Sequence, residues 1–162
     1  MKNGKGVYTL IIKLTKKVKL KVGGLGSLKF EKGWYAYTGS ALGSGGLIGR
    51  IQRHMKKDKR CFWHIDYLLN NEYSSIKAII CAVSNTRYEC KIVRKIASMT
   101  AKPIKGFRVS DCKEGCRSHL YYMGDNPNEI AKSIVYVYSN MNLMANSYLL
   151  CNSNLVKNNL NK

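Results

Sequence analysis

The sequence predicts an α+β domain in which a small central antiparallel sheet is flanked by helices. Segments with strand periodicity come first along the chain, and segments with helical periodicity follow them. The length of 162 residues is enough for one domain with a real core. We expect three core strands and an N-terminal hairpin, with helices packed on the sheet.

The strands are predicted from runs of β-branched and apolar residues. Residues 6–14 form the most apolar run, and residues 17–22 alternate valine or leucine with lysine. Only Thr15 and Lys16 separate these two segments, which predicts a tight hairpin. Further strands are predicted at 27–30, 33–39, 76–83 and 118–123.

Helices are predicted where apolar residues recur at helical spacing. The first begins at Leu47, after a loop rich in glycine and serine, and a short second helix covers 62–69. A third helix covers 85–99, with Asn85 or Thr86 as its N-cap.

The end of the chain is predicted to extend a compact domain that covers residues 1–124. Pro127 suits the first turn of a fourth helix, so we interpret residues 125–151 as a helical extension. Residues 152–162 are rich in asparagine, and we expect them to form a disordered tail.

The formal net charge of +19 at pH 7 is extreme for a chain of this size. It indicates a polyanionic partner, nucleic acid first and an anionic membrane second, with a merely solvated basic surface as the alternative. No apolar run reaches the roughly 18 residues that span a bilayer, and the N-terminus has no signal-peptide core. We therefore expect a cytoplasmic protein without a membrane partner. Its six cysteines lack the density of a secreted disulfide scaffold, so most are expected to be buried thiols.

Glu89 carries the strongest chemical signal among the few acidic residues. On a helical wheel it points within the apolar face that Ile92, Val93 and Ile96 define. A buried carboxylate without a partner is costly, so it must find a partner or a metal. One carboxylate suits Mg²⁺, which keeps several waters and shares the phosphates of a substrate. The alternative is a glutamate that caps the helix at the rim of the core.

The helix that begins at Leu47 carries a basic stripe. Arg50, His54 and Lys57 lie at positions i, i+4 and i+7, and Arg53 lies on the same helix. Such a stripe suits phosphate, because the planar guanidinium of arginine pairs with two oxygens. A solvated basic face is the alternative interpretation.

The loop before this helix has features of an anion site. Gly39, Ser40 and Ser44 offer backbone N–H groups and hydroxyls without bulky side chains. The helix N-terminus adds a partial positive charge, so we expect a phosphate here. A plain flexible loop is the alternative.

Tyr8 and Tyr37 lie on two of the predicted strands, where tyrosine most often serves packing. A phenol with an ordinary pKa of about 10 acts as a general base only if nearby cations lower that pKa. Arg50 and a metal ion are the candidates for this effect.

Several ordered motifs resemble those of the GIY-YIG nuclease superfamily. GVY at 6–8 and YTG at 37–39 are similar to its two tripeptides, with Thr38 in place of the usual isoleucine. The string GWYAYTGSALGSGGLIGRIQRH…WHIDYLL, followed by SDC…CRSHLYY, resembles a small branch of that superfamily that also occurs fused to endonuclease III. Six blocks fall in sequence, which makes the resemblance specific.

The resemblance implies a three-stranded antiparallel sheet flanked by helices and cleavage of a DNA phosphodiester with one divalent metal, Mg²⁺ or Mn²⁺. It makes Tyr8 the general base, and Tyr37 a residue that positions the scissile phosphate. Arg50 stabilises the transition state, His54 assists as a hydrogen-bond or proton-relay partner, and Glu89 holds the metal. The asparagine that many relatives carry after the glutamate has no counterpart in SMTAKP. The residues expected at phosphate or DNA are Gly39, Ser40, Ser44, Arg53, Lys57, His64 and His119.

Two other interpretations remain open. One is a non-catalytic module that binds nucleic acid and retains only the phosphate site. The other is a domain stabilised by zinc, because some cysteines and histidines have the spacing of metal ligands. A disulfide between Cys112 and Cys116 is also conceivable, although its geometry is awkward. The candidate zinc ligands are Cys61, His64, Cys112, Cys116 and His119.

Overall fold

A seven-stranded antiparallel sheet forms the centre of the molecule in the computed structural model, which describes residues 4–99, 101–107, 112, 114–151 and 154–158. The central strand β1 (Gly6–Leu14) pairs with β4 (Gly33–Ala41) on one side and with β5 (Ser74–Val83) on the other. The α+β prediction is confirmed, and the sheet is larger than three core strands. The outer strands are β7 (Leu120–Gly124) and β6 (Lys102–Pro103) beyond β4, and β8 (Asn146–Cys151) and β9 (Asn154–Asn158) beyond β5.

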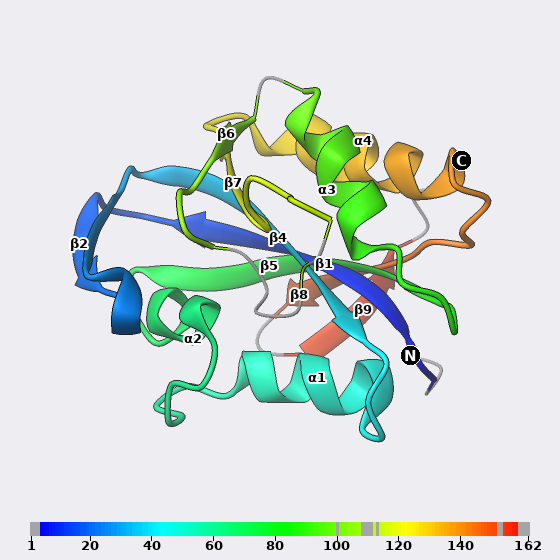
Figure 1. The fold of residues 1–162 in the computed structure, drawn as a ribbon, viewed down its shortest axis with the longest axis horizontal. Helices are drawn as coiled ribbons and strands as arrows, with labels where there is room; N and C mark the ends of the chain where they lie inside the picture. The colour runs from blue at the N-terminus through cyan, green and yellow to red at the C-terminus, as the bar shows by residue number, and fades with distance from the viewer. Residues whose placement is uncertain (1–3, 100, 108–111, 113, 152–153, 159–162) are drawn as a thin grey trace.

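Helices cover both faces of this sheet (Figure 1). Helices α1 (Gly46–Met55) and α2 (His64–Leu69) pack on one face, and α3 (Glu89–Ala97) and α4 (Pro127–Ser139) pack on the other. Side chains of β1 alternate between the two layers, so this strand is apolar on both faces and its sequence reads as a continuous apolar run.

The predicted N-terminal hairpin is wrong. Both edges of β1 are already paired, and β2 (Val18–Lys21) instead pairs with β3 (Ser27–Phe30) as a separate two-stranded sheet. The short 3₁₀ helix η1 (Gly23–Leu25) connects the two strands. The predicted alternation within this segment is confirmed, since the lysines of β2 are exposed while its apolar residues face inward.

Several boundaries differ from the sequence prediction. Helix α3 begins at Glu89, so neither Asn85 nor Thr86 is its N-cap. Those residues form a tight turn in which the backbone N–H of Thr86 donates to Ser84 Oγ over 3.0 Å. Helix α1 begins at Gly46, one residue before the predicted start.

The C-terminal segment adds strands as well as a helix. Helix α4 ends at Ser139, and β8 then pairs with β5 in the main sheet. Strand β9 lies inside the predicted tail and pairs with β8, so a wholly disordered tail is wrong. Residues 152–153 and 159–162 of that tail lie outside the described residues.

The cysteines at positions 61, 81, 90, 112 and 116 form no disulfide bonds, so Cys112 is not joined to Cys116. No helix within the described ranges has the length and apolar character needed to cross a membrane.

Candidate functional site

Strand β1 and helix α1 bring Tyr8 and His54 into direct contact. The hydroxyl of Tyr8 lies 2.8 Å from Nε2 of His54, and both side chains are buried. Gly39 lies opposite Tyr8 on β4, where a Cβ atom would come within 2.5 Å of the Tyr8 hydroxyl oxygen. Glycine is therefore needed at the third position of the YTG motif to leave room for this hydrogen bond.

Tyr37 and Arg50 complete a group around this pair. The ring of Tyr37 lies 5.9 Å from the ring of His54 and 6.5 Å from that of Tyr8, measured between centroids. The half-buried guanidinium of Arg50 lies over the ring of Trp63, 4.3 Å from its centroid, and Trp63 in turn packs on His54. The structure thus gathers four predicted site residues, together with Trp63, to which the sequence analysis gave no role.

Burial sets the protonation states of this pair. Burial lowers the pKa of His54 to about 3, although Asp66 acts in the opposite direction, so the imidazole is neutral near pH 7. Burial also raises the pKa of Tyr8 well above its ordinary value, and the opposing effect of Arg50 is smaller. Arg50 acts on the pKa of Tyr8 in the predicted direction, but its effect is smaller than that of burial, so the pKa is not lowered overall in the free protein. Tyr8 is therefore a neutral phenol. When the neutral imidazole carries its proton on Nδ1, the nitrogen that faces Asp66, the Tyr8 hydroxyl donates a hydrogen bond to Nε2 of His54.

Asp66 is a site residue that sequence reasoning missed. It is fully buried on α2, and its Oδ2 accepts hydrogen bonds from Arg53 Nη2 at 3.0 Å and from the backbone N–H groups of Phe62 and Trp63. Its Oδ1 lies 3.9 Å from Nδ1 of His54, beyond direct hydrogen-bond distance. The available signal was an acidic residue within a mostly apolar helix.

Arg53 and Lys57 have structural partners in place of phosphate. The guanidinium of Arg53 is held by Asp66 and by the carbonyl of Arg60. The ammonium of Lys57 donates to the carbonyls of Leu69 at 2.6 Å and Ser74 at 2.8 Å. Both cations therefore stabilise the segments around α2. These contacts do not support the predicted role of Arg53 and Lys57 as phosphate ligands.

The glycine–serine loop is only partly free to bind an anion. At the N-terminus of α1, the backbone N–H groups of Gly46 and Leu47 donate to the carbonyls of Gly43 and Gly4. These two donors are consequently not directed at a ligand. Ser44 is exposed in the loop, and Ser40 is half-buried on β4.

Glu89 is buried at the first residue of α3, with 2% of its surface exposed. Its Oε1 lies 3.6 Å from Nη1 of Arg87, while its Oε2 is buried without a hydrogen-bond partner among the described residues. Helix α3, which begins at Glu89, packs in the layer opposite α1, which carries Arg50. A buried carboxylate oxygen in this state fits a cation ligand.

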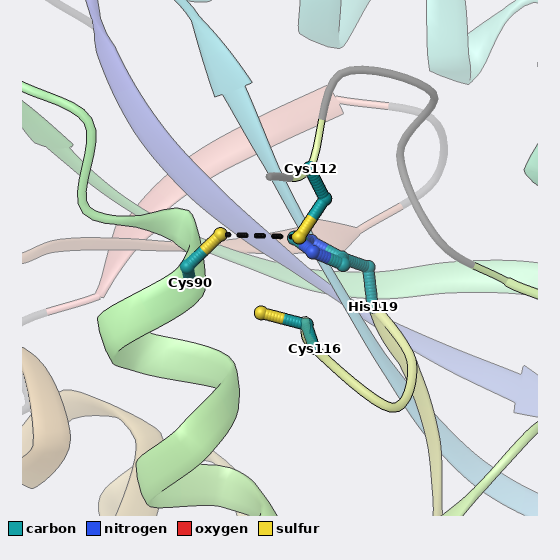
Figure 2. A group of neighbouring side chains, drawn as sticks. All are labelled: Cys90, Cys112, Cys116 and His119. Atoms are coloured by element: carbon teal, nitrogen blue, oxygen red, sulfur yellow. Dashed lines mark hydrogen bonds between the residues drawn. The ribbon is translucent and has the colours of Figure 1, made fainter. Parts of the chain in front are cut away.

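Four other side chains form a compact group, which we call the cysteine–histidine cluster (Figure 2). One ligand atom from each lies within 4.8 Å of the others, and Sγ of Cys90 is 3.6 Å from Sγ of Cys112. Cys90 comes from α3, and the remaining ligands precede β7. The cluster consists of Cys90, Cys112, Cys116 and His119.

The predicted zinc ligand set is corrected at three positions. Cys61 is not in the cluster, and its sulfur accepts a hydrogen bond from Asn70 Nδ2 at 3.6 Å. His64 packs against the ring of Phe107. Cys90, which was counted only among the buried thiols, supplies the fourth ligand. Its proximity to the others depends on how α3 packs, so spacing in the sequence carried no signal for it.

His119 is oriented toward the cysteines. It is fully buried, which is incompatible with the predicted contact to DNA. Its Nδ1 lies 3.2 Å from the carbonyl oxygen of Thr38, which can only accept, so Nδ1–H is the donor and, in the neutral ring, Nε2 carries the lone pair. That Nε2 is buried and has no hydrogen-bond partner among the described residues.

Stability is expected to fall on acidification because of His54. Its pKa in the folded protein is about 3, below the ordinary value of about 6.5, so below pH 6.5 the unfolded chain binds the proton more readily. The stability is present above pH 6.5 and is lost as the pH falls toward 3. Between pH 7 and pH 5 the free energy of unfolding should drop by about 2 kcal/mol from this group alone. Urea denaturation at both pH values measures the drop, which should be largely absent in His54→Gln; an equal drop in that variant would contradict the assignment.

Comparison with known families gives one match. Residues 7–142 match the family described as Domain of unknown function DUF123. The matched range begins inside β1 and ends after α4, so it includes both the Tyr8–His54 group and the cysteine–histidine cluster. Searches of the curated proteins and of the solved structures found no match.

Proposed function

This chain belongs to the DUF123 family, and we propose that it is a metal-dependent DNA endonuclease of the GIY-YIG type that hydrolyses phosphodiester bonds. The observation that carries the proposal is the 2.8 Å hydrogen bond from Tyr8 to His54, with Tyr37 and Arg50 beside it. These four residues come from β1, β4 and α1, and they match the positions that the GIY-YIG resemblance assigns to catalysis.

In the proposed reaction, Tyr8 acts as a base through a relay. A water molecule gives its proton to the Tyr8 oxygen while Tyr8 passes its own proton to Nε2 of His54, so the phenol never needs to be free as an anion. The resulting imidazolium is stabilised by the buried carboxylate of Asp66, which lies 3.9 Å from Nδ1. The water oxygen forms a bond to phosphorus, and the bond from phosphorus to the leaving oxygen breaks.

Arg50 is the proposed phosphate ligand. It is the half-buried cation of the group, and its guanidinium carbon lies 4.3 Å from the centroid of the Trp63 ring. A guanidinium fixed in this way can pair with two oxygens of the phosphate and stabilise the charge that builds up in the transition state.

Glu89 is the proposed metal ligand. Its unpartnered buried oxygen fits Mg²⁺ or Mn²⁺, and a metal bound there would neutralise charge on the leaving oxygen. Independently of any metal, Glu89 sits in the first turn of α3, and Arg87 is its cationic neighbour.

DNA is the proposed partner, and binding is expected to depend steeply on salt. The chain has a net charge of +19, and Lys19, Lys21 and Lys29 project from the exposed face of the β2–β3 sheet. Between 50 and 200 mM salt the affinity should fall roughly 10³-fold, because bound phosphates release counterions. Replacing the three lysines by glutamine should lower the slope of log affinity against log salt by about three. Fluorescence anisotropy with labelled DNA measures both, and a flat response would exclude backbone-directed binding.

Incubation with a panel of duplex, branched and single-stranded DNA, with Mg²⁺ or with EDTA, tests the proposed activity. Cleavage that requires Mg²⁺ is the expected result. Tight binding without cleavage of any substrate would favour the second candidate, a module that binds nucleic acid without catalysis.

Zinc is the metal we propose for the cysteine–histidine cluster. Three sulfurs and one imidazole nitrogen form a soft, four-ligand set, which zinc prefers and which Mg²⁺ does not. An iron–sulfur cluster fits less well, because ligand atoms within 4.8 Å of one another leave no room for an inorganic core between them.

A further inference from the structure

We propose that the cysteine–histidine cluster is a closed structural metal site that fixes the backbone on either side of the nuclease centre, at Thr38 next to Tyr37 and at Cys90 next to Glu89. The positioning role rests on the proposed nuclease function. The metal site and its mechanical role in the fold do not depend on it.

The geometry of the cluster is close to that of a tetrahedral zinc site. With Zn–S bonds of about 2.3 Å, two thiolates of one zinc ion lie about 3.8 Å apart. The 3.6 Å between the sulfurs of Cys90 and Cys112 is near this value and far longer than a disulfide bond of about 2.0 Å. Four protein ligands occupy all four positions, which leaves none for water. Such a closed site is structural.

The histidine is prepared for metal binding. Its Nδ1–H donates to the carbonyl of Thr38, which fixes the ring and directs the lone pair of Nε2 toward the cysteines (Figure 2). Ligand histidines in metal sites use such a hydrogen bond to fix their tautomer. Without a metal, the buried Nε2 has no partner among the described residues, which is a costly state for a polar atom.

At α3, the metal site holds the backbone next to Glu89. Among the described residues no side chain caps the N-terminus of α3, so other contacts must hold its first turn. A metal bound to Cys90 would tie this turn to the segment that carries Cys116. Arg94, one turn further along α3, makes a second link to the same segment through the carbonyl and the carboxylate of Glu114. Because Glu89 directly precedes Cys90, fixing this turn also fixes the candidate metal ligand of the nuclease centre.

At β4, the metal site holds the backbone next to Tyr37. Two hydrogen bonds join His119 to the backbone of Thr38. The Nδ1–H of the His119 ring donates to the Thr38 carbonyl, and the His119 carbonyl accepts from the Thr38 N–H at 3.0 Å. Along β4, the side chains of Tyr37 and Thr38 point to opposite faces. Tyr37 packs in the layer of α1, while the cluster lies on the side of α3. Metal binding on the α3 side of the sheet thus fixes β4, the strand that carries Tyr37 on its α1 side.

The test compares the wild-type chain with Cys90→Ser and with the matched control Cys61→Ser, which alters a cysteine outside the cluster. Elemental analysis should find one zinc per chain in the wild type and in Cys61→Ser, and at least tenfold less in Cys90→Ser. Hydrogen exchange should accelerate in Cys90→Ser at residues 89–93 and at Thr38. Amides of the β1–β5 pairing should remain protected, because the metal does not hold those strands.

Two results would overturn the proposal. One is the absence of stoichiometric metal from the wild-type chain after purification without chelators and reloading with zinc. The other is loss of metal with unchanged exchange at 89–93 and Thr38. Should Cys90→Ser fail to fold, Co²⁺ loading of the wild type decides the ligand set: intense thiolate-to-cobalt absorption supports the site, and its absence rejects it. If the wild type binds zinc but cuts no DNA, only the nuclease function fails.

Discussion

Replacing Tyr8 by phenylalanine is expected to slow DNA cleavage by about two to four orders of magnitude, with DNA affinity nearly unchanged. The ring and its packing in the core remain, while the hydroxyl that donates to Nε2 of His54 is lost. Without that oxygen, no group connects the attacking water to His54 in the proposed relay. Single-turnover cleavage and equilibrium binding measure the two quantities separately.

Tyr138→Phe is the matched control. Tyr138 is also fully buried, and its hydroxyl lies 3.0 Å from Oγ1 of Thr9, but it belongs to the layer on the opposite face of the sheet. Both variants lose one buried hydroxyl and should lose a similar amount of stability, about 1 kcal/mol. Only Tyr8→Phe should cleave DNA more slowly than the wild type. Cleavage near the wild-type rate in Tyr8→Phe would make Tyr8 a packing residue and move the search for the base to Tyr37 or His54.

The sequence was sufficient to locate most strands and helices, because hydrophobic periodicity is a local signal. The strands at 27–30 and 76–83 and the helix near Leu47 illustrate this. The pairing of strands is not local, and the hairpin prediction failed for that reason. Residues 17–22 are adjacent to β1 in the sequence, but the backbone N–H of Thr15 donates to the carbonyl of Tyr73, and both edges of β1 are taken by β4 and β5.

The same limit applies to the sites. The proximity of Tyr8, Tyr37, Arg50 and His54 was implied by ordered motifs, since a family resemblance carries tertiary information. The partners of single residues were harder to predict. Lys57 was expected at phosphate because its charge and helical position are visible in the sequence, whereas the carbonyls that hold it come from the last residue of α2 and the first residue of β5.

The protonation states of Tyr8 and His54 could not be predicted from the sequence either. The basic residues near Tyr8 predicted a lowered pKa, but burial acts more strongly than Arg50 and raises it. The extent to which a side chain is covered by neighbours from distant segments cannot be obtained from the charge pattern alone. The neutral Tyr8–His54 pair therefore led to a relay in place of a free phenolate.

Replacing Glu89 by glutamine is expected to remove Mg²⁺-dependent cleavage altogether. Glutamine has the same shape, so the first turn of α3 is retained, but the anionic ligand for the metal is lost. DNA affinity should be equal or higher, because a negative charge is removed from a site that binds phosphate. In EDTA, the free energy of unfolding should be unchanged or higher, since a buried carboxylate with an unpartnered oxygen is replaced by a neutral amide.

Glu31→Gln is the control for the charge change itself. Glu31 pairs with Lys17 on the surface, with more than half of each side chain exposed, so this variant makes the same change in net charge away from the site. It should cleave DNA at the wild-type rate and with the same Mg²⁺ dependence. If Glu89→Gln also cleaves at that rate while losing stability, Glu89 only caps α3 at the rim of the core. Loss of cleavage without loss of stability or binding assigns the carboxylate to the metal, since a capping role predicts the reverse pattern.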